Sequence, residues 1–248
     1  AHNALMTVRS NACLSSELNI CVARYALKQK LLITLILNLP YLAESDMQAL
    51  LGQLSEQRWD DHRLYHHSRI NQSLHLVSAL TFIFAYVMLF INPVIASLAA
   101  WLVSMTTRQA GHFFFEPRGF DYVNNMTDEH KEKIKVGYNI QRKIVLMGVW
   151  ASMPVIAYFY PTLLEWAVPN EKYHDFIGLT AMWWLYLGLG GMLFRMLHLW
   201  VQDSALNALA WGVKIMTDPF HDVKLYYKAP FYLLKGELID PMTHVHAK

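Results

Sequence analysis

The hydrophobic residues of this chain lie in long runs, and this pattern predicts helices that cross a membrane. Four such runs occur, at positions 74–91, 94–110, 144–160 and 176–197. A helix of about 20 mainly apolar residues spans the hydrocarbon core of a bilayer, so each run is close to the required length. Asn92-Pro93 forms a turn between the first two runs, and Pro161 ends the third. We therefore expect an all-α fold: a polytopic membrane helical bundle of about four transmembrane helices, with both ends cytoplasmic.

The two ends of the chain do not follow this pattern. Residues 31–42 are apolar but too few to span a bilayer, so residues 1–46 are predicted to form an N-terminal extension with one short apolar helix. The membrane helical bundle is expected over residues 47–215. Beyond it polar and apolar residues alternate, which predicts a cytoplasmic or interfacial tail over residues 216–248.

Basic residues fall almost entirely on one side of the predicted spans. Lysine and arginine accumulate in loops on the cytoplasmic side of membrane proteins. If the first span begins on the cytoplasmic side, Lys172 is the one basic residue flanking the spans that lies on the opposite side of the membrane. The side with the basic residues holds Arg58, Arg63, Arg69, Arg108, Arg118, the lysines of the 116–143 loop, Arg195, Lys214 and Lys224. We expect an integral membrane protein with its active site on the cytoplasmic side, in a bacterial inner membrane, or in the endoplasmic reticulum if the host is eukaryotic.

Composition excludes several other classes of protein. The chain is 54% hydrophobic and only 16% charged, which is too apolar for an ordinary soluble domain. Its two cysteines, Cys13 and Cys21, support neither a disulfide scaffold nor a zinc site built from cysteines. A glycine-rich phosphate loop and a basic nucleic-acid-binding stripe are both missing from the sequence, so no nucleic-acid partner is expected.

Histidines gather at the cytoplasmic end of the predicted bundle. His67, Asn71 and His75 are spaced i, i+4, i+8, so on a helix they share one face, with His66 beside it. Further histidines follow at the inner ends of the second and fourth spans and in the tail. The candidate metal ligands are His66, His67, His75, His112, His198 and His221. Ionisable groups at membrane depth are costly, so we expect these residues to have a function.

Imidazoles with one carboxylate favour iron first, then zinc, with manganese behind. Glu116 lies one helical turn after His112, where it can bind the metal or fix the proton of that histidine. Asn71 can orient a ligand or a bound water. An apolar bundle that opens at a metal predicts a substrate with a long acyl chain. Arg69 or Arg118 can form an ion pair with the carboxylate of that substrate.

The stretch before the first span resembles the signature of a known family. Its motif is His66-x4-Asn71-x3-His75, and the doublet in Tyr65-His66-His67 is similar to a Tyr-His-His variant of that motif. The family is the metal-dependent 2-hydroxy fatty acid dioxygenases. It comprises the fungal endoplasmic-reticulum enzyme of fatty acid α-oxidation and its bacterial relatives.

A second motif of the same family follows in the next span. Gln109-x2-His112-x3-Glu116, with Gly111 before the histidine, is similar to the family's second motif. The resemblance covers residues 65–116. The sequence departs from the family after the glutamate, where Pro117 is followed by Arg-Gly-Phe, and the region from position 143 onward has no counterpart in the family.

The resemblance implies an Fe(II) enzyme that uses O2 to shorten a 2-hydroxy fatty acid by one carbon, yielding an aldehyde. It makes His66, His75 and His112 iron ligands or near-ligands, and Asn71 and Glu116 residues that shape the site. The expected partners are the lipid bilayer, a long-chain fatty-acid-type substrate and O2, with homo-oligomerisation left open.

Two alternative functions remain open at this point. The spacing His62-x3-His66-His67 matches one histidine box of membrane di-iron hydroxylases and desaturases, although their further boxes are missing from this sequence. The other alternative is a non-catalytic membrane subunit or scaffold whose histidines bind haem, pigment or nothing.

Overall fold

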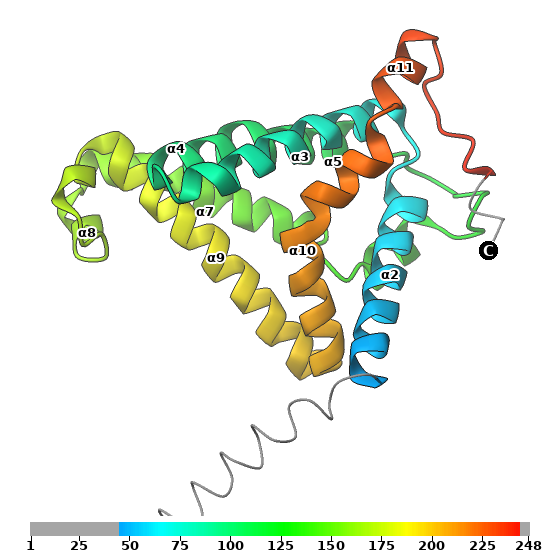
Figure 1. Cartoon of the computed structure of the whole chain (residues 1–248), viewed down its shortest axis with the longest axis horizontal. Coiled ribbons are helices and arrows are strands. Elements are labelled where there is room, and N and C mark those ends of the chain that lie inside the picture. Colours follow the sequence, from blue (N-terminus) through cyan, green and yellow to red (C-terminus); the bar gives the residue numbers. More distant parts are fainter. Residues whose placement is uncertain (1–44, 244–248) are drawn as a thin grey trace, which may run out of the picture. The chain divides into compact units, whose positions relative to one another are not determined.

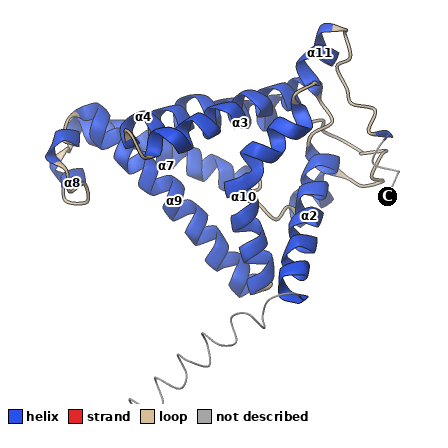
Figure 2. Ribbon diagram, viewed as in Figure 1, coloured by secondary structure: helices blue, strands red, loops and turns tan. Residues whose placement is uncertain are grey.

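Helices joined by short loops make up the described part of the chain, residues 45–243 of this computed structural model, and no strand occurs there (Figure 2). The all-helical fold class is thus confirmed. The chain divides after Ala49 into two units. The first is described only from Ser45, so the short apolar helix predicted over residues 31–42 lies outside the described residues. Apart from the bounds of helix α2 (Ser45–Tyr65), everything below concerns residues 50–243.

Twelve helical elements follow one another along the described chain (Figure 1). The long helices are α2 (Ser45–Tyr65), α3 (Arg69–Leu89), α7 (Ile140–Phe159), α9 (Phe176–Gln202) and α10 (Ala205–Tyr226). The shorter ones are α4 (Pro93–Leu98), the π-helix η1 (Ala99–Met105), α5 (Thr106–Phe114), α6 (Asp128–Ile134), α8 (Thr162–Glu165), the 3-10 helix η2 (Glu171–Tyr173) and α11 (Ala229–Leu234).

Three of these helices, α3, α7 and α9, are long and apolar enough to cross a membrane. They coincide with the first, third and fourth predicted runs. The second run is helical as well, but it is divided among α4, η1 and α5. A π-helix has wider turns than an α-helix and is common near functional sites. Here it precedes α5, which carries Arg108, Gly111 and His112.

Helix α3 is apolar on its outer face and polar on its inner face. Val77, Leu80 and Phe84 are exposed along one stripe. The opposite face is buried and holds Asn71, Gln72, His75 and Ser78 among small alanines. This arrangement is the reverse of a helix in a soluble protein, because lipid accepts apolar side chains while polar ones must find partners inside the bundle.

Polar side chains and small residues join the spans at close range. The Ser97 hydroxyl of α4 donates to the Ala181 carbonyl of α9 at 2.6 Å. Trp101 of η1 donates to the Trp184 carbonyl at 2.7 Å, and the Trp184 ring nitrogen donates to the Trp150 carbonyl of α7 at 2.8 Å. Such bonds, with small residues between them, are typical of helix packing in membranes, where burial away from water gives little driving force.

Helix α10 differs from the tail that the sequence predicts. It runs through the predicted boundary at residue 215 and packs against both α3 and α9 (Figure 1). The polar residues that alternate along this helix do not mark a water-exposed surface. Lys214, Asp218 and Asp222 recur every four residues and are buried on one face, where they form ion pairs inside the bundle.

Candidate metal centre

The short loop between α2 and α3 carries His66 and His67, and local hydrogen bonds define its course. Ser68 caps α3, its hydroxyl accepting from the Asn71 backbone N–H at 3.4 Å. The Asn71 side chain turns back and donates to the Tyr65 carbonyl at 3.0 Å, at the end of α2. Asn71 therefore positions the loop that presents the histidines.

The C-terminal segment holds the same loop from the other side. The Gln72 side chain donates to the His66 carbonyl at 2.7 Å and to the Asp240 carboxylate at 2.9 Å, and the Asp240 backbone N–H donates to the His67 carbonyl at 2.7 Å. Arg69, predicted to bind a substrate carboxylate, lies 2.8 Å from Asp240. Its guanidinium is thus already paired within the chain.

His66, His75 and His112 form a tight group. Among the described residues they are the one set of three whose ligand atoms lie close enough to hold a metal, with one ring nitrogen from each within 4.8 Å of the others. The Nε2 atoms of His66 and His75 are 3.2 Å apart. The ring centroids are separated by 4.3 Å, 4.9 Å and 5.3 Å. The structure thus brings together three of the six predicted ligands, from the α2–α3 loop, α3 and α5.

The outward-facing nitrogens show where the protons of His66 and His112 lie. Nδ1 of His66 is 2.7 Å from the Asp61 carbonyl, which can only accept, so Nδ1 carries the proton. Nδ1 of His112 lies 2.8 Å from the Glu116 carboxylate, an arrangement that likewise places the proton there. Both rings then turn an unprotonated Nε2 toward the centre of the group.

His75 supplies the third ring of the group. Its Nδ1 is 3.6 Å from the Asp222 carboxylate, a charge contact too long for a hydrogen bond, and that nitrogen is a buried atom with no hydrogen-bond partner in the described chain. The 3.2 Å between the Nε2 atoms of His66 and His75 is a hydrogen-bond distance, so in the absence of a metal a proton on His75 Nε2 can be donated to His66. Burial lowers the pKa of His66 well below its usual value, and the neighbouring His75 adds to this, so the ring is neutral. The donor set fits a metal ion.

No known protein family, curated protein or solved structure matches this chain.

A buried charge network connects the helices that carry the ligands. Arg108 of α5 lies 2.9 Å from Asp222 and 3.9 Å from Asp218, both of α10. Lys214 lies 2.6 Å from Asp218 and 3.2 Å from Asp61 of α2. The network therefore links α2, α5 and α10 beside His75. Sequence reasoning missed it because α10 read as a tail, although the i, i+4 spacing of its three charged residues was a usable signal.

Tyr226 forms one wall of the site and was also missed. Its ring centroid lies 5.6 Å from that of His66 and 6.2 Å from that of His75, and its hydroxyl is 3.2 Å from His62 Nδ1. The side chain is buried, so the ring shields the histidine group from water.

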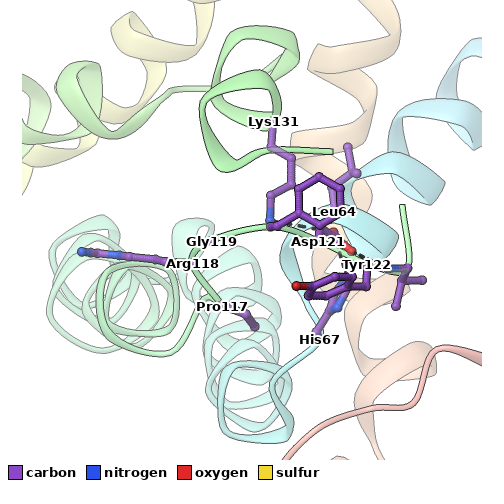
Figure 3. A pocket seen from close by; sticks show the side chains of 10 residues that line it. Leu64, His67, Pro117, Arg118, Gly119, Asp121, Tyr122 and Lys131 are labelled. Carbon is purple, nitrogen blue, oxygen red and sulfur yellow. Dashed lines mark hydrogen bonds and ion pairs between the residues drawn. The ribbon is translucent and has the colours of Figure 1, made fainter. Parts of the chain in front are cut away.

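His67 and Arg118, two further predicted site residues, lie elsewhere. His67 lines a separate pocket, where Asp121 lies 3.7 Å from it and 3.8 Å from Lys131 (Figure 3). The Nε2 atom of His67 also donates to the Arg63 carbonyl. Arg118 extends away from these residues in Figure 3 and donates to the Phe113 carbonyl at 3.1 Å, where it caps the end of α5.

His198 and His221 are also outside the group of three. His198 sits on α9, with its Nδ1 2.5 Å from Arg195 and its ring stacked on Phe194. His221 precedes Asp222 on α10, and neighbouring residues on a helix point about 100° apart. Asp222 faces His75, so His221 is directed away from it.

Removing the Glu116 carboxylate should weaken metal binding without abolishing it. In Glu116→Ala the His112 Nδ1 loses its acceptor, and the proton is free to occupy Nε2, the atom that faces the group. Loss of such an outer partner typically costs about 10–100-fold in metal affinity. The metal affinity of the variant and of the wild type is measured by titration against a competing chelator. Glu116→Gln, which keeps an accepting oxygen, should lose less. Glu129→Ala, at an exposed position, is the control; equal losses in Glu116→Ala and Glu129→Ala would contradict the assigned role.

Proposed function

We propose that this chain is an Fe(II)-dependent membrane dioxygenase that oxidises a 2-hydroxy fatty acid to an aldehyde one carbon shorter. The observation that carries the proposal is the group of three imidazoles, in which the outer nitrogens of His66 and His112 are held by Asp61 and Glu116 and Asp222 lies 3.6 Å from that of His75. The resemblance of the 65–116 region to the 2-hydroxy fatty acid dioxygenases supports the same reaction. Neutral imidazoles held by outer partners are the usual ligands of a catalytic metal that keeps open positions.

One metal ion is favoured over two. The di-iron alternative needs His62 and His67 to join His66, but His62 lies against Tyr226 and His67 donates to the Arg63 carbonyl. The described residues contain no second group of three metal-binding side chains. Asp218 and Asp222, the nearby carboxylates of α10, are paired with lysine and arginine. These contacts support a mononuclear centre.

The residues around the centre have distinct roles in this proposal. Bound at the three imidazoles, Fe(II) supplies a Lewis acid for the 2-hydroxy acid and redox chemistry for O2, which zinc lacks. Glu116 and the Asp61 carbonyl hold protons on the outer nitrogens, while Tyr226 limits access of water. Conversion of a 2-hydroxy acid to the aldehyde and CO2 releases two electrons and two protons, which would reduce O2 to hydrogen peroxide.

The membrane arrangement follows from the same proposal. The segment from α4 through η1 to α5 acts as a fourth span, so that α3, α7, α9 and this segment cross the bilayer with both ends cytoplasmic. The histidine group then lies at the cytoplasmic end, and the acyl chain extends between the spans. A bacterial inner membrane suits this form, and a eukaryotic homologue would lie in the endoplasmic reticulum.

Metal analysis and a product assay test the proposal together. Detergent-purified protein reconstituted with iron under argon is expected to hold about one iron per chain. Adding a 2-hydroxy fatty acid and O2 should then yield the aldehyde one carbon shorter, detected by mass spectrometry. Two irons per chain would favour the hydroxylase or desaturase class. Absence of bound metal would favour the scaffold.

A further inference from the structure

The C-terminal segment, residues 237–243, pairs with the loop between α2 and α3. The Arg69 backbone N–H donates to the Leu238 carbonyl at 2.9 Å. The Asp240 backbone N–H donates to the His67 carbonyl at 2.7 Å. Between these two bonds, one residue of each segment forms an antiparallel bridge. The backbone of the C-terminal segment therefore lies along the loop that presents the first histidine of the metal centre.

The Asp240 side chain makes further contacts, and both of its carboxylate oxygens are engaged. Oδ1 accepts from the Met242 backbone N–H at 3.1 Å. Oδ2 accepts from the Gln72 side chain at 2.9 Å and lies 2.8 Å from the Arg69 guanidinium. Only 7% of the Asp240 side chain is exposed, so these contacts are shielded from water. Hydrogen bonds to a charged group are about twice as strong as those between neutral groups.

Gln72 connects this carboxylate to His66. Its amide nitrogen donates both to Asp240 and to the His66 carbonyl, the latter at 2.7 Å. Its amide oxygen accepts from Arg69 at 2.9 Å, and the residue is only 1% exposed. Two hydrogen bonds therefore lead from Asp240 to the backbone of His66, whose Nε2 atom lies 3.2 Å from that of His75.

His66 depends on such support more than the other two ligands do. His75 is on α3 and His112 is on α5, so the backbone hydrogen bonds of a helix fix the position of each. His66 lies instead in the short loop between α2 and α3. Sites built on helices are held more precisely than sites on loops, where bonds from neighbouring residues must supply the rigidity.

We propose that Asp240 is a positioning residue of the metal centre, which through Gln72 holds His66 where its Nε2 can bind the metal. The inference rests on the proposed function and assigns a residue that lies outside both sequence motifs. It also gives Arg69 a structural role: its guanidinium is bonded to Asp240 and Gln72 and so completes the support of the loop.

Asp240→Asn tests this assignment, because it keeps the shape of the side chain but not its two accepting oxygens. One end of the new amide donates, so either the Met242 N–H or the donors of Gln72 and Arg69 lose their acceptor. The affinity of the detergent-purified protein for Co2+ should fall about 10-fold or more. It is measured by visible absorption against a competing chelator. Glu237→Gln removes the same charge at an exposed position of the same segment and should bind Co2+ as the wild type does.

Bound Cu2+ shows whether His66 is the ligand that is lost. Electron paramagnetic resonance of the Cu2+ form counts the coordinated imidazoles. We expect three in the wild type and two in Asp240→Asn, with His66→Ala as the reference spectrum. A general loosening of the fold would lower the melting temperature without this selective loss. Asp240→Glu, which keeps the charge and both accepting oxygens, should regain part of the Co2+ affinity.

A second variant keeps the test decisive if Asp240→Asn elutes as aggregate on size exclusion. Gln72→Leu breaks the same connection from the other side and should show the same loss of Co2+ affinity and of one imidazole. Unchanged Co2+ affinity, an equal loss in Glu237→Gln, or three coordinated imidazoles in the Cu2+ form of the variant would overturn the assignment.

Failure of the inference can be told apart from failure of the proposed function. Loss of Co2+ affinity in Asp240→Asn, in a protein whose iron form yields no aldehyde under O2, would support the assignment and refute the reaction. Aldehyde production by the wild type, with unchanged Co2+ affinity in Asp240→Asn, would support the reaction and refute the assignment. A wild type that binds none of these metals would refute both.

Discussion

Replacing His112 by alanine should remove bound iron and O2-dependent aldehyde formation while the protein still inserts into the membrane. His112 supplies one of three converging nitrogens and comes from α5, whereas His66 lies in the α2–α3 loop and His75 on α3. The loss should exceed the roughly 10–100-fold expected for an outer partner such as Glu116, because a direct ligand is removed. His75→Ala should have the same effect. Iron per chain after anaerobic reconstitution, with the product assay, measures both.

His198→Ala is the matched control for this experiment. His198 sits at the end of a span, as His112 does, but contacts Arg195 and Phe194 instead of the group of three. It should therefore retain iron and activity. If His112→Ala keeps both iron and activity, the metal centre is not where we place it.

Adding one methyl group at Gly111 should disrupt the site almost as severely. A Cβ atom there would lie 2.1 Å from Asn71 Oδ1 and 3.5 Å from His75 Cδ2. Asn71 cannot turn away easily, because it is buried and bonded to the Tyr65 carbonyl. Helix α5 must move away from α3, which separates His112 from His75. We expect Gly111→Ala to cost about 1–3 kcal/mol of stability and most of the iron affinity.

Thermal unfolding in detergent and iron titration check this result. Gly148→Ala is the matched control, since a Cβ added at this position in α7 meets nothing within 4 Å. That change should leave stability the same or raise it by about 1 kcal/mol, because alanine favours a helix. Adding Asn71→Ala to Gly111→Ala should restore part of the lost stability. A Gly111→Ala protein with the melting temperature and iron content of the wild type would contradict the close packing of α3 on α5.

The site is built partly from residues of the two sequence motifs and partly from residues outside them. Gly111 and Asn71 belong to the two sequence motifs, and the structure gives them a shared physical reason, the close approach of α3 and α5. Asp222 belongs to neither motif. Its place beside His75 emerges only when α10 packs against α3.

The sequence by itself determined the helical fold and the approximate bounds of α3, α7 and α9. These features depend on apolar periodicity and length, which are local properties of a chain. It also indicated a histidine cluster, because polar residues at the ends of spans share one depth. The division of the second run by η1 was not predictable in this way, since it depends on how α5 meets α3.

Spacing along the chain left six candidate histidines, the resemblance implied three of them, and the tertiary structure brings those three together. His66, His75 and His112 come together, while His67, His198 and His221 lie apart, although all six are similar in sequence context. The structure also placed Asp222 beside His75. Partners so distant in sequence are chosen by the packing of whole helices, and each buried charge is tolerated only where that packing supplies an opposite charge or leaves room for one.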